Sequence, residues 1–253
     1  MKLICYILIT EVKRMFQTIF KRYENKYILS KKQYSSVLGE IKSRTIPDKF
    51  GQSDVCSIYY DTPDKRIIRA SIEKPVYKEK LRLRSYGIPK GGSDCFLELK
   101  KKYKGIVYKR RVLTSYQSGI SYMNGDETAV KPSQIKSEID YFKAYYGTLL
   151  PSVGIFYRRL AFYDEKDPNV RLTFDSDILF RDTELDLKNG IYGELILPDG
   201  MYLMEIKTAG AMPLWTAEML SRLKIYPASF SKYGTAYKNI LNKKLQSGGN
   251  NCA

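Results

Sequence analysis

Several short runs of this 253-residue sequence alternate charged and aliphatic side chains at a spacing of two. The longest is YKEKLRLRSY at residues 77–86, and shorter ones are CFLELKK at 95–101 and YLMEIKT at 202–208. Residues two apart in a β-strand point to the same face, so each run separates aliphatic groups from Lys, Arg and Glu. One such strand is most simply a solvated face. Several together favour a closed antiparallel barrel with a charged lumen, which would suit a polyanion and a divalent metal.

The charge balance indicates an anionic partner. Lys and Arg number 43 against 27 Asp and Glu, for a formal net charge of +16. Nucleic acid, a membrane surface, a nucleotide or polyphosphate would each fit this excess. The chain has no histidine, which excludes His-based acid–base catalysis, His-activated nucleophiles and His metal sites. A metal would therefore sit on carboxylates, which favours Mg²⁺ or Mn²⁺ with phosphate oxygens as further ligands.

Cysteine usage and the N-terminal sequence favour a cytoplasmic protein. The four cysteines, at positions 5, 56, 95 and 252, form no paired framework, as is typical of a reducing compartment. The apolar run at residues 3–9 is far shorter than the roughly 20 residues of a membrane helix. Charged residues follow it at once, with no small-residue cleavage site. Met15 is a second candidate start, which would make residues 1–14 an upstream extension.

The remaining patterns predict an α+β domain with many antiparallel strands and helices inserted between them. We expect helices at 30–43 (capped by Ser30), 65–70, two within 115–150, 213–223 and 231–245. Strands are expected at Phe20–Leu29, Val55–Tyr60, Tyr77–Tyr86, Asp94–Lys101, Ile106–Leu113, Ser152–Tyr163, Val170–Asp175 (extended by Asp177–Phe180 after a bend), Gly190–Leu197 and Tyr202–Lys207. The predicted division is an extension at 1–19, one domain at 20–245 and a disordered tail at 246–253.

Nine motifs occur along the chain in a specific order: ENKY, YYDTPD, KLRLRSYG, FLELKKK, VYKRR, YRRLAFYD, VRLTFD, LMEIKT and SFSKYGTAY. Over residues 20–241 this ordered set resembles the polyphosphate polymerase domain of the vacuolar transporter chaperone (VTC) type, within the triphosphate tunnel superfamily. The resemblance implies an eight-stranded antiparallel β-barrel tunnel with inserted and flanking helices. It also implies transfer of the γ-phosphate of ATP onto a growing polyphosphate chain, with Mn²⁺ or Mg²⁺ as cofactor.

Strand parity and the resemblance together select catalytic residues that would bind phosphate: Lys26, Arg82, Arg84, Lys100, Lys109, Arg111, Arg159 and Arg171. Taken singly, each is more simply a surface cation. The choice of Lys109 and Arg111 over Arg110 depends on the register of a hairpin, and Arg159 is preferred to Arg158 on similar grounds. A slip of one residue would turn each set to the opposite face.

The resemblance also implies metal and substrate contacts. Glu205 is the first candidate metal ligand, and Glu24 and Glu98 follow; each could instead balance neighbouring cations. Lys207 shares a face with Glu205 and could reach phosphate. Ser231 and Lys232 open the last helix, where free N–H groups favour an anion, although Ser229 or Ser231 could simply cap it. We expect Tyr59, Tyr60 and Asp61 to close a strand and turn, away from substrate.

Other functions stay open at this stage. Hydrolytic members of the superfamily carry E-x-E-x-K in the first strand, and Arg22 replaces the first acid here. Fewer carboxylates favour a polymerase over a triphosphatase or a class IV adenylate cyclase. The alternatives are a metal-dependent inorganic tripolyphosphatase or nucleoside triphosphatase, and a non-catalytic polyphosphate or nucleic-acid binding module. The expected partners are ATP and inorganic polyphosphate. The family suggests a separate membrane protein partner, and no nucleic-acid-reading motif is recognisable.

Overall fold

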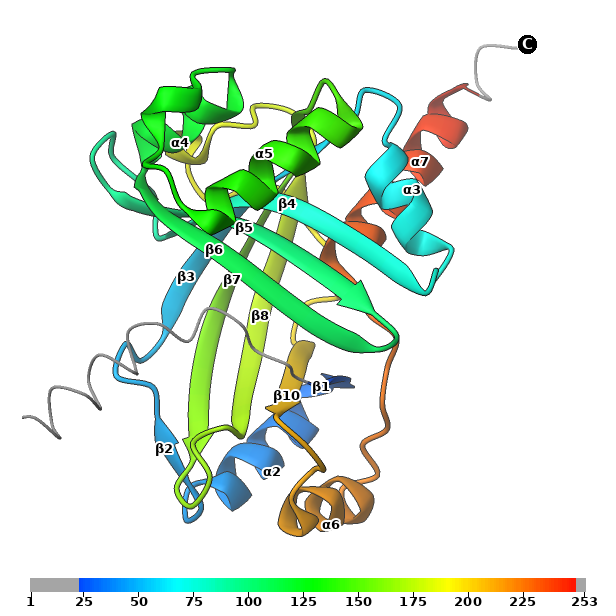
Figure 1. Cartoon of the computed structure of the whole chain (residues 1–253). Coiled ribbons are helices and arrows are strands. Elements are labelled where there is room, and N and C mark those ends of the chain that lie inside the picture. The colour runs from blue at the N-terminus through cyan, green and yellow to red at the C-terminus, as the bar shows by residue number, and fades with distance from the viewer. Residues whose placement is uncertain (1–22, 249–253) are drawn as a thin grey trace, which may run out of the picture.

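One large antiparallel sheet carries the fold (Figure 1). The structure is a computed structural model and describes residues 23–248. Its helices are α2 (Lys31–Ile41), α3 (Arg66–Ile72), α4 (Tyr116–Met123), α5 (Gln134–Tyr146), α6 (Leu214–Arg222) and α7 (Lys232–Gly248), with short 3₁₀ turns η1 (Glu127–Ala129) and η2 (Leu187–Asn189). Its strands are β1 (Tyr23–Leu29), β2 (Thr45–Pro47), β3 (Ser53–Asp61), β4 (Tyr77–Tyr86), β5 (Asp94–Tyr103), β6 (Ile106–Ser115), β7 (Leu150–Asp164), β8 (Arg171–Arg181), β9 (Glu194–Leu195) and β10 (Tyr202–Thr208).

The α+β prediction is confirmed, and its departures are local. Eight strands pair in the order β1-β10-β8-β7-β3-β4-β5-β6, all antiparallel, while the short strands β2 and β9 add to β7 and β8. The strand β2 was not predicted. The predicted bend in β8 is a positive φ of 48° at Asp177, opposite a register shift between Phe156 and Arg158. This β-bulge bends the strand without ending it.

The predicted closure of the barrel is wrong in one respect. Within residues 23–248, no backbone ladder joins the edge strands β1 and β6. A side-chain ion pair bridges this side instead, because Lys100 of β5 reaches Glu24 of β1 at 2.8 Å. Figure 1 shows β4–β6 running across the long axis of β7 and β8, so the sheet is strongly curled. The curl gives the sheet an inner face without a continuous hydrogen-bonded ring.

Helices cover the outer face of the curled sheet and bury its aliphatic residues. Helices α4 and α5 pack on β4 and β5, where four leucines are fully buried (Leu81, Leu83, Leu97 and Leu99). The helices α2 and α6 pack on the outer face of β1, β8 and β10. The helices α3 and α7 instead pack against inner-face residues of β3 and β7, among them Tyr59 and Tyr157. Each buried leucine contributes roughly 1.5–3 kcal/mol. Since the aliphatic half of every alternating run is used outside, the charged half faces inward.

Local signals at the helix ends are largely as predicted. Ser30 caps α2 in a reciprocal capping box with Gln33. Pro213 is the N-cap of α6 and not part of its first turn. Asp61 is buried and accepts from the backbone N–H groups of Thr62, Ile67 and Ile68, so it anchors the start of α3.

Several predictions concern the two ends of the chain. The predicted extension at 1–19, Met15 and Arg22 lie outside the described residues. Helix α7 continues through Gly248, and therefore includes the first three residues of the predicted tail. No helix within residues 23–248 is long and apolar enough to span a membrane.

Candidate functional site

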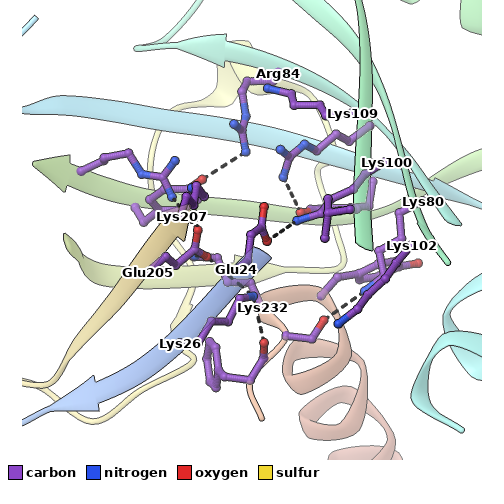
Figure 2. Close-up of a pocket in the computed structure, with 18 of the residues that line it drawn as sticks. Glu24, Lys26, Lys80, Arg84, Lys100, Lys102, Lys109, Glu205, Lys207 and Lys232 are labelled. Carbon is purple, nitrogen blue, oxygen red and sulfur yellow. Dashed lines mark hydrogen bonds and ion pairs between the residues drawn. The ribbon is translucent and has the colours of Figure 1, made fainter. Parts of the chain in front are cut away.

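The inner face of the sheet encloses a cavity of about 1640 Å³ (Figure 2). Fifteen Lys and Arg residues line it, against six Asp and Glu. The strands contribute to this lining mainly through even-numbered residues of β4 and β5 and odd-numbered residues of β6, β7, β8 and β10. We call this cavity the lumen. Its cation excess makes it a binding site for a strongly anionic molecule.

One group of charges surrounds Glu205 on β10. Its carboxylate lies 2.9 Å from Lys207, 3.5 Å from Lys232, 3.6 Å from Lys26 and 3.9 Å from Arg159. Burial alone would raise the pKa of Glu205, but these four cations outweigh it and hold the pKa well below its usual range. We call these five residues, together with Asp175, the Glu205 cluster.

Asp175 of β8 is the second anion of the Glu205 cluster. It is fully buried and accepts two hydrogen bonds from Arg159, at 2.7 and 2.8 Å. Lys232 lies 2.6 Å from it. Burial would raise the pKa of Asp175, and Arg159 and Lys232 together lower it. The two carboxylates therefore fix the positions of four cations that face the lumen.

A second group surrounds Glu98 on β5, and we call it the Glu98 cluster. Glu98 is 1% exposed and lies 2.7 Å from Arg82, 3.7 Å from Arg84 and 2.5 Å from Lys109. Burial opposes its ionisation, but Arg84, Arg82 and Lys109 bring its pKa well below the usual range. The buried carboxylate of Glu98 thus orients three cations, two on β4 and one on β6.

Two tyrosines hold the arginines of the Glu98 cluster in place. Tyr59 accepts a hydrogen bond of 2.7 Å from Arg82, and Tyr157 accepts one of 3.1 Å from Arg84. Both tyrosines line the lumen. Tyr59 lies near the end of β3, as expected, but β3 also presents it on the inner face, so its expected distance from substrate stays a prediction.

The start of α7 closes one side of the lumen. Ser231 accepts from the backbone N–H of Gly234 at 3.1 Å, so it caps the helix. It also accepts from the Lys80 ammonium at 3.0 Å. Burial and the nearby cations Lys26 and Lys100 lower the pKa of Lys80 to about 7. Both predicted roles of Ser231, cap and lumen contact, are compatible with this position.

The remaining predicted residues also face the lumen. Lys100 pairs with Glu24, whose pKa falls to about 2 because its neighbouring lysines outweigh the effect of burial. Arg171 lies 2.9 Å from Asp48 at one edge of the lumen. Arg111 lies 4.8 Å over the ring of Phe96.

The strand register explains why parity selected the inner residues. Lys109 pairs across the hairpin with Lys100, and Arg111 pairs with Glu98. Arg110 points to the other face, where it reaches Glu138 of α5 at 3.3 Å. Arg158 is exposed and pairs with Asp177, outside the lumen lining. The structure thus brings the fourteen predicted site residues around one cavity, while their roles stay predictions.

Comparison with known proteins decides the family. A model described as the VTC domain matches residues 21–241. The chain belongs to the VTC domain family. No match was found among curated proteins.

Two solved structures share the fold of this VTC domain. A putative adenylate cyclase from Bacillus halodurans has 12% identity and a TM-score of 0.56, covering 85% of this chain and 96% of the other. The putative adenylyl cyclase HpAC1 from Hippeastrum, described as having a dominant triphosphatase activity, has 15% identity and a TM-score of 0.54 over 87% and 96%. At these identities the likeness establishes the triphosphate tunnel fold.

Sequence reasoning did not assign Asp175, Lys80 or Tyr157. The signal for Asp175 was present, since Arg171, Thr173 and Asp175 alternate in VRLTFD and so share a face. Lys80 shares the face of Arg82 and Arg84 in the same way. Tyr157 likewise shares a face with Arg159 in YRRLAFYD, but its contact with Arg84 had no signal, because that residue comes from a distant strand.

The lumen of the VTC domain offers few carboxylates to a metal. Within the described residues, no group of three or more Asp, Glu, Cys or His could hold a metal ion. Mg²⁺ and Mn²⁺ are often bound by one or two carboxylates together with substrate phosphates. Glu205 lies close enough to Glu24 to raise the pKa of that carboxyl, and this pair fits such a site. Glu98 is engaged by three cations and fits it less well.

Proposed function

We propose that this VTC domain is a polyphosphate polymerase that transfers the γ-phosphate of ATP onto a polyphosphate chain in the lumen. The excess of cations along the length of the lumen is the observation that carries the proposal. The lining includes both Lys78 and Tyr86, at opposite ends of β4, a distance of roughly 26 Å in a strand. A linear substrate with a charge on every phosphate would use such a length, whereas a single triphosphate would not require all of it.

The two clusters supply what phosphoryl transfer requires. The reaction needs reactants held in line and stabilisation of the negative charge that spreads over the transferred group. Arg82 and Arg84 are held by Glu98, and Arg159 is held by Asp175. Arginines fixed in this way bind phosphate oxygens without having to be reorganised during the reaction.

The pairing of the lumen carboxylates favours transfer to phosphate over transfer to water. Glu24, Glu98, Asp175 and Glu205 all lie within 4 Å of Lys or Arg. Their ionised forms are stabilised, so they are weak bases for activating water. The end of a polyphosphate chain is already ionised and needs no general base.

Glu205 and Glu24 would hold Mg²⁺ or Mn²⁺, with phosphate oxygens completing the coordination. The bound metal would neutralise charge on the phosphates. Lys26 and Lys207, which both pair with Glu205, would orient the same phosphates. The removal of divalent metal by a chelator should therefore stop turnover.

A metal-dependent tripolyphosphatase or nucleoside triphosphatase is the second candidate. The fold shared with HpAC1, described as having a dominant triphosphatase activity, favours it. The two reactions differ in their products. A polymerase releases ADP with little orthophosphate, whereas a hydrolase releases one orthophosphate for each bond that it cleaves.

The test is to quantify ADP and orthophosphate after incubation of the protein with ATP and Mn²⁺ or Mg²⁺. We expect ADP to exceed orthophosphate severalfold in the wild type. Arg110→Ala, on the outer face, is the control that should retain this ratio. Equal amounts of ADP and orthophosphate would support the hydrolase. Formation of neither product would leave a non-catalytic polyphosphate-binding module.

A further inference from the structure

The lumen-facing residues of three neighbouring strands form rungs across the sheet. Each rung joins residues that are paired directly between β4, β5 and β6. In order along the lumen, the rungs are Lys78–Lys102–Val107, Lys80–Lys100–Lys109, Arg82–Glu98–Arg111 and Arg84–Phe96–Leu113. The rungs at one end of the lumen therefore consist mainly of lysines, and those at the other end include aromatic and aliphatic side chains.

We define the lysine end by Lys74, Lys78, Lys102 and Lys238, which line the lumen beside α3 and α7. In Figure 2, Lys80 and Lys102 lie on one side of the lumen and Arg84 lies away from them. Within residues 23–248, Lys78, Lys80 and Lys102 have no carboxylate within ion-pair distance. These three amines are therefore available to a polyanion.

We define the aromatic end by Phe50, Tyr86, Phe96 and Leu113, all of which line the lumen. Two acidic residues of the lining adjoin this end, namely Asp54, next to the Val55 that pairs with Tyr86, and Asp94, two residues before Phe96 on β5. The backbone of Asp54 accepts from Gly87, directly after Tyr86. Apolar rings and carboxylates therefore lie beside the arginines at this end, whereas lysines predominate at the other, so the two ends of the lumen differ in hydrophobicity and in their density of unpaired cations.

Tyr86 is held with its ring exposed at the aromatic end. The residue is 53% exposed, and its ring makes a T-shaped contact with Phe96, with the ring centroids 6.1 Å apart and an interplanar angle of 79°. Arg111 lies over the ring of Phe96, which fixes that ring from another side. A planar ring supported in this way is a stacking surface for a nucleobase.

We propose that the base of ATP stacks on Tyr86 at the aromatic end and that polyphosphate leaves through the lysine end. The inference rests on the proposed function, since it assumes that ATP enters the lumen. Phosphates bound by Arg82 and Arg84 would place the nucleoside within about two rungs, or roughly 13 Å, of these arginines. The chain then grows toward the rungs with unpaired lysines.

The first test compares the binding of two ligands by calorimetry. One is a non-hydrolysable imido analogue of ATP, and the other is inorganic tripolyphosphate, which has no base. Tyr86→Ala should weaken the analogue about tenfold, as loss of one stacking contact does, and leave tripolyphosphate within about twofold. Tyr86→Phe should bind as the wild type does. Tyr103→Ala is the matched control, because this tyrosine is similarly exposed on β5 but lies outside the lumen lining.

The second test concerns the lysine end. Lys78→Gln combined with Lys102→Gln should shorten the polyphosphate product severalfold while the affinity for the ATP analogue changes less than about twofold. Lys101→Gln is the control, since Lys101 pairs with Glu138 on the outer face.

The outcomes separate this inference from the proposed function. Equal weakening of both ligands by Tyr86→Ala, or no weakening of either, would overturn the base site. Unchanged product length in the double lysine variant would overturn the exit. If Tyr86→Ala selectively lost affinity for the analogue but the wild type made no polyphosphate, the base site would be supported and the polymerase refuted. A wild type that binds no analogue would refute both.

Discussion

Replacement of Glu205 by Gln tests how the lumen holds its cations. In the wild type, Glu205 has four cations between 2.9 and 3.9 Å. At an effective dielectric constant of about 20, each such pair is worth about 4–6 kcal/mol before desolvation is counted. After desolvation, loss of one partner from a buried group costs about 3–5 kcal/mol. We therefore expect Glu205→Gln to lower the melting temperature by roughly 10 °C without preventing folding.

The same variant should be stabilised unusually well by phosphate. Tripolyphosphate brings negative charge to the cations that Glu205 leaves unpaired, so it should raise the melting temperature of Glu205→Gln more than that of the wild type. Differential scanning calorimetry with and without tripolyphosphate measures both effects. Glu194→Gln removes a half-exposed acid paired with Lys243 and should shift the melting temperature little. An equally stable Glu205→Gln, with the same response to tripolyphosphate as the wild type, would refute this electrostatic reasoning.

Three further predictions follow from the same geometry. Glu205→Gln should abolish metal-dependent turnover of ATP while phosphate binding is largely kept; intact turnover would remove Glu205 as a metal ligand. Arg82→Ala combined with Arg84→Ala should weaken tripolyphosphate binding and turnover at least about 100-fold, since each charged hydrogen bond is worth about 1.5–3 kcal/mol, whereas Arg110→Ala should change neither by more than about twofold. Tripolyphosphate affinity should fall as the pH rises from about 6 to about 8. Burial and the surrounding cations, namely Lys26, Lys100, Lys78 and Arg82, lower the pKa of Lys80 to about 7. The neutral amine that forms above this pH attracts phosphate less than the ammonium does. Lys80→Gln should weaken this dependence, while Lys109, whose pKa burial also lowers to about 7, would keep part of it. An unchanged pH profile in that variant would contradict the assignment.

The sequence could predict which side chains of each strand share a face, and so which of them line the lumen. An alternating run fixes which side chains share a face, and burial of the aliphatic half decides which face is inside. Lys109, Arg111 and Arg159 were separated from Arg110 and Arg158 on this basis. The bounds of β4 were predicted for the same reason, because its alternation is unbroken over the whole strand.

Features that depend on the meeting of distant strands were not accessible in this way. Asp175 and Lys232 are 57 residues apart yet form an ion pair of 2.6 Å. The open edge between β1 and β6 depends on how far the whole sheet curls. The strand β2 is only three residues long, so its pattern is too short to distinguish from a loop.

Phosphorus NMR of a reaction with ATP and Mg²⁺ tests the central claim most directly, because it separates internal phosphates of a chain from terminal and free phosphate. The account predicts that internal polyphosphate signal appears as the γ-phosphate signal of ATP declines and ADP accumulates. It also predicts that Glu205→Gln gives no internal phosphate signal. Consumption of ATP with growth of the orthophosphate signal alone would contradict the account and identify a triphosphatase.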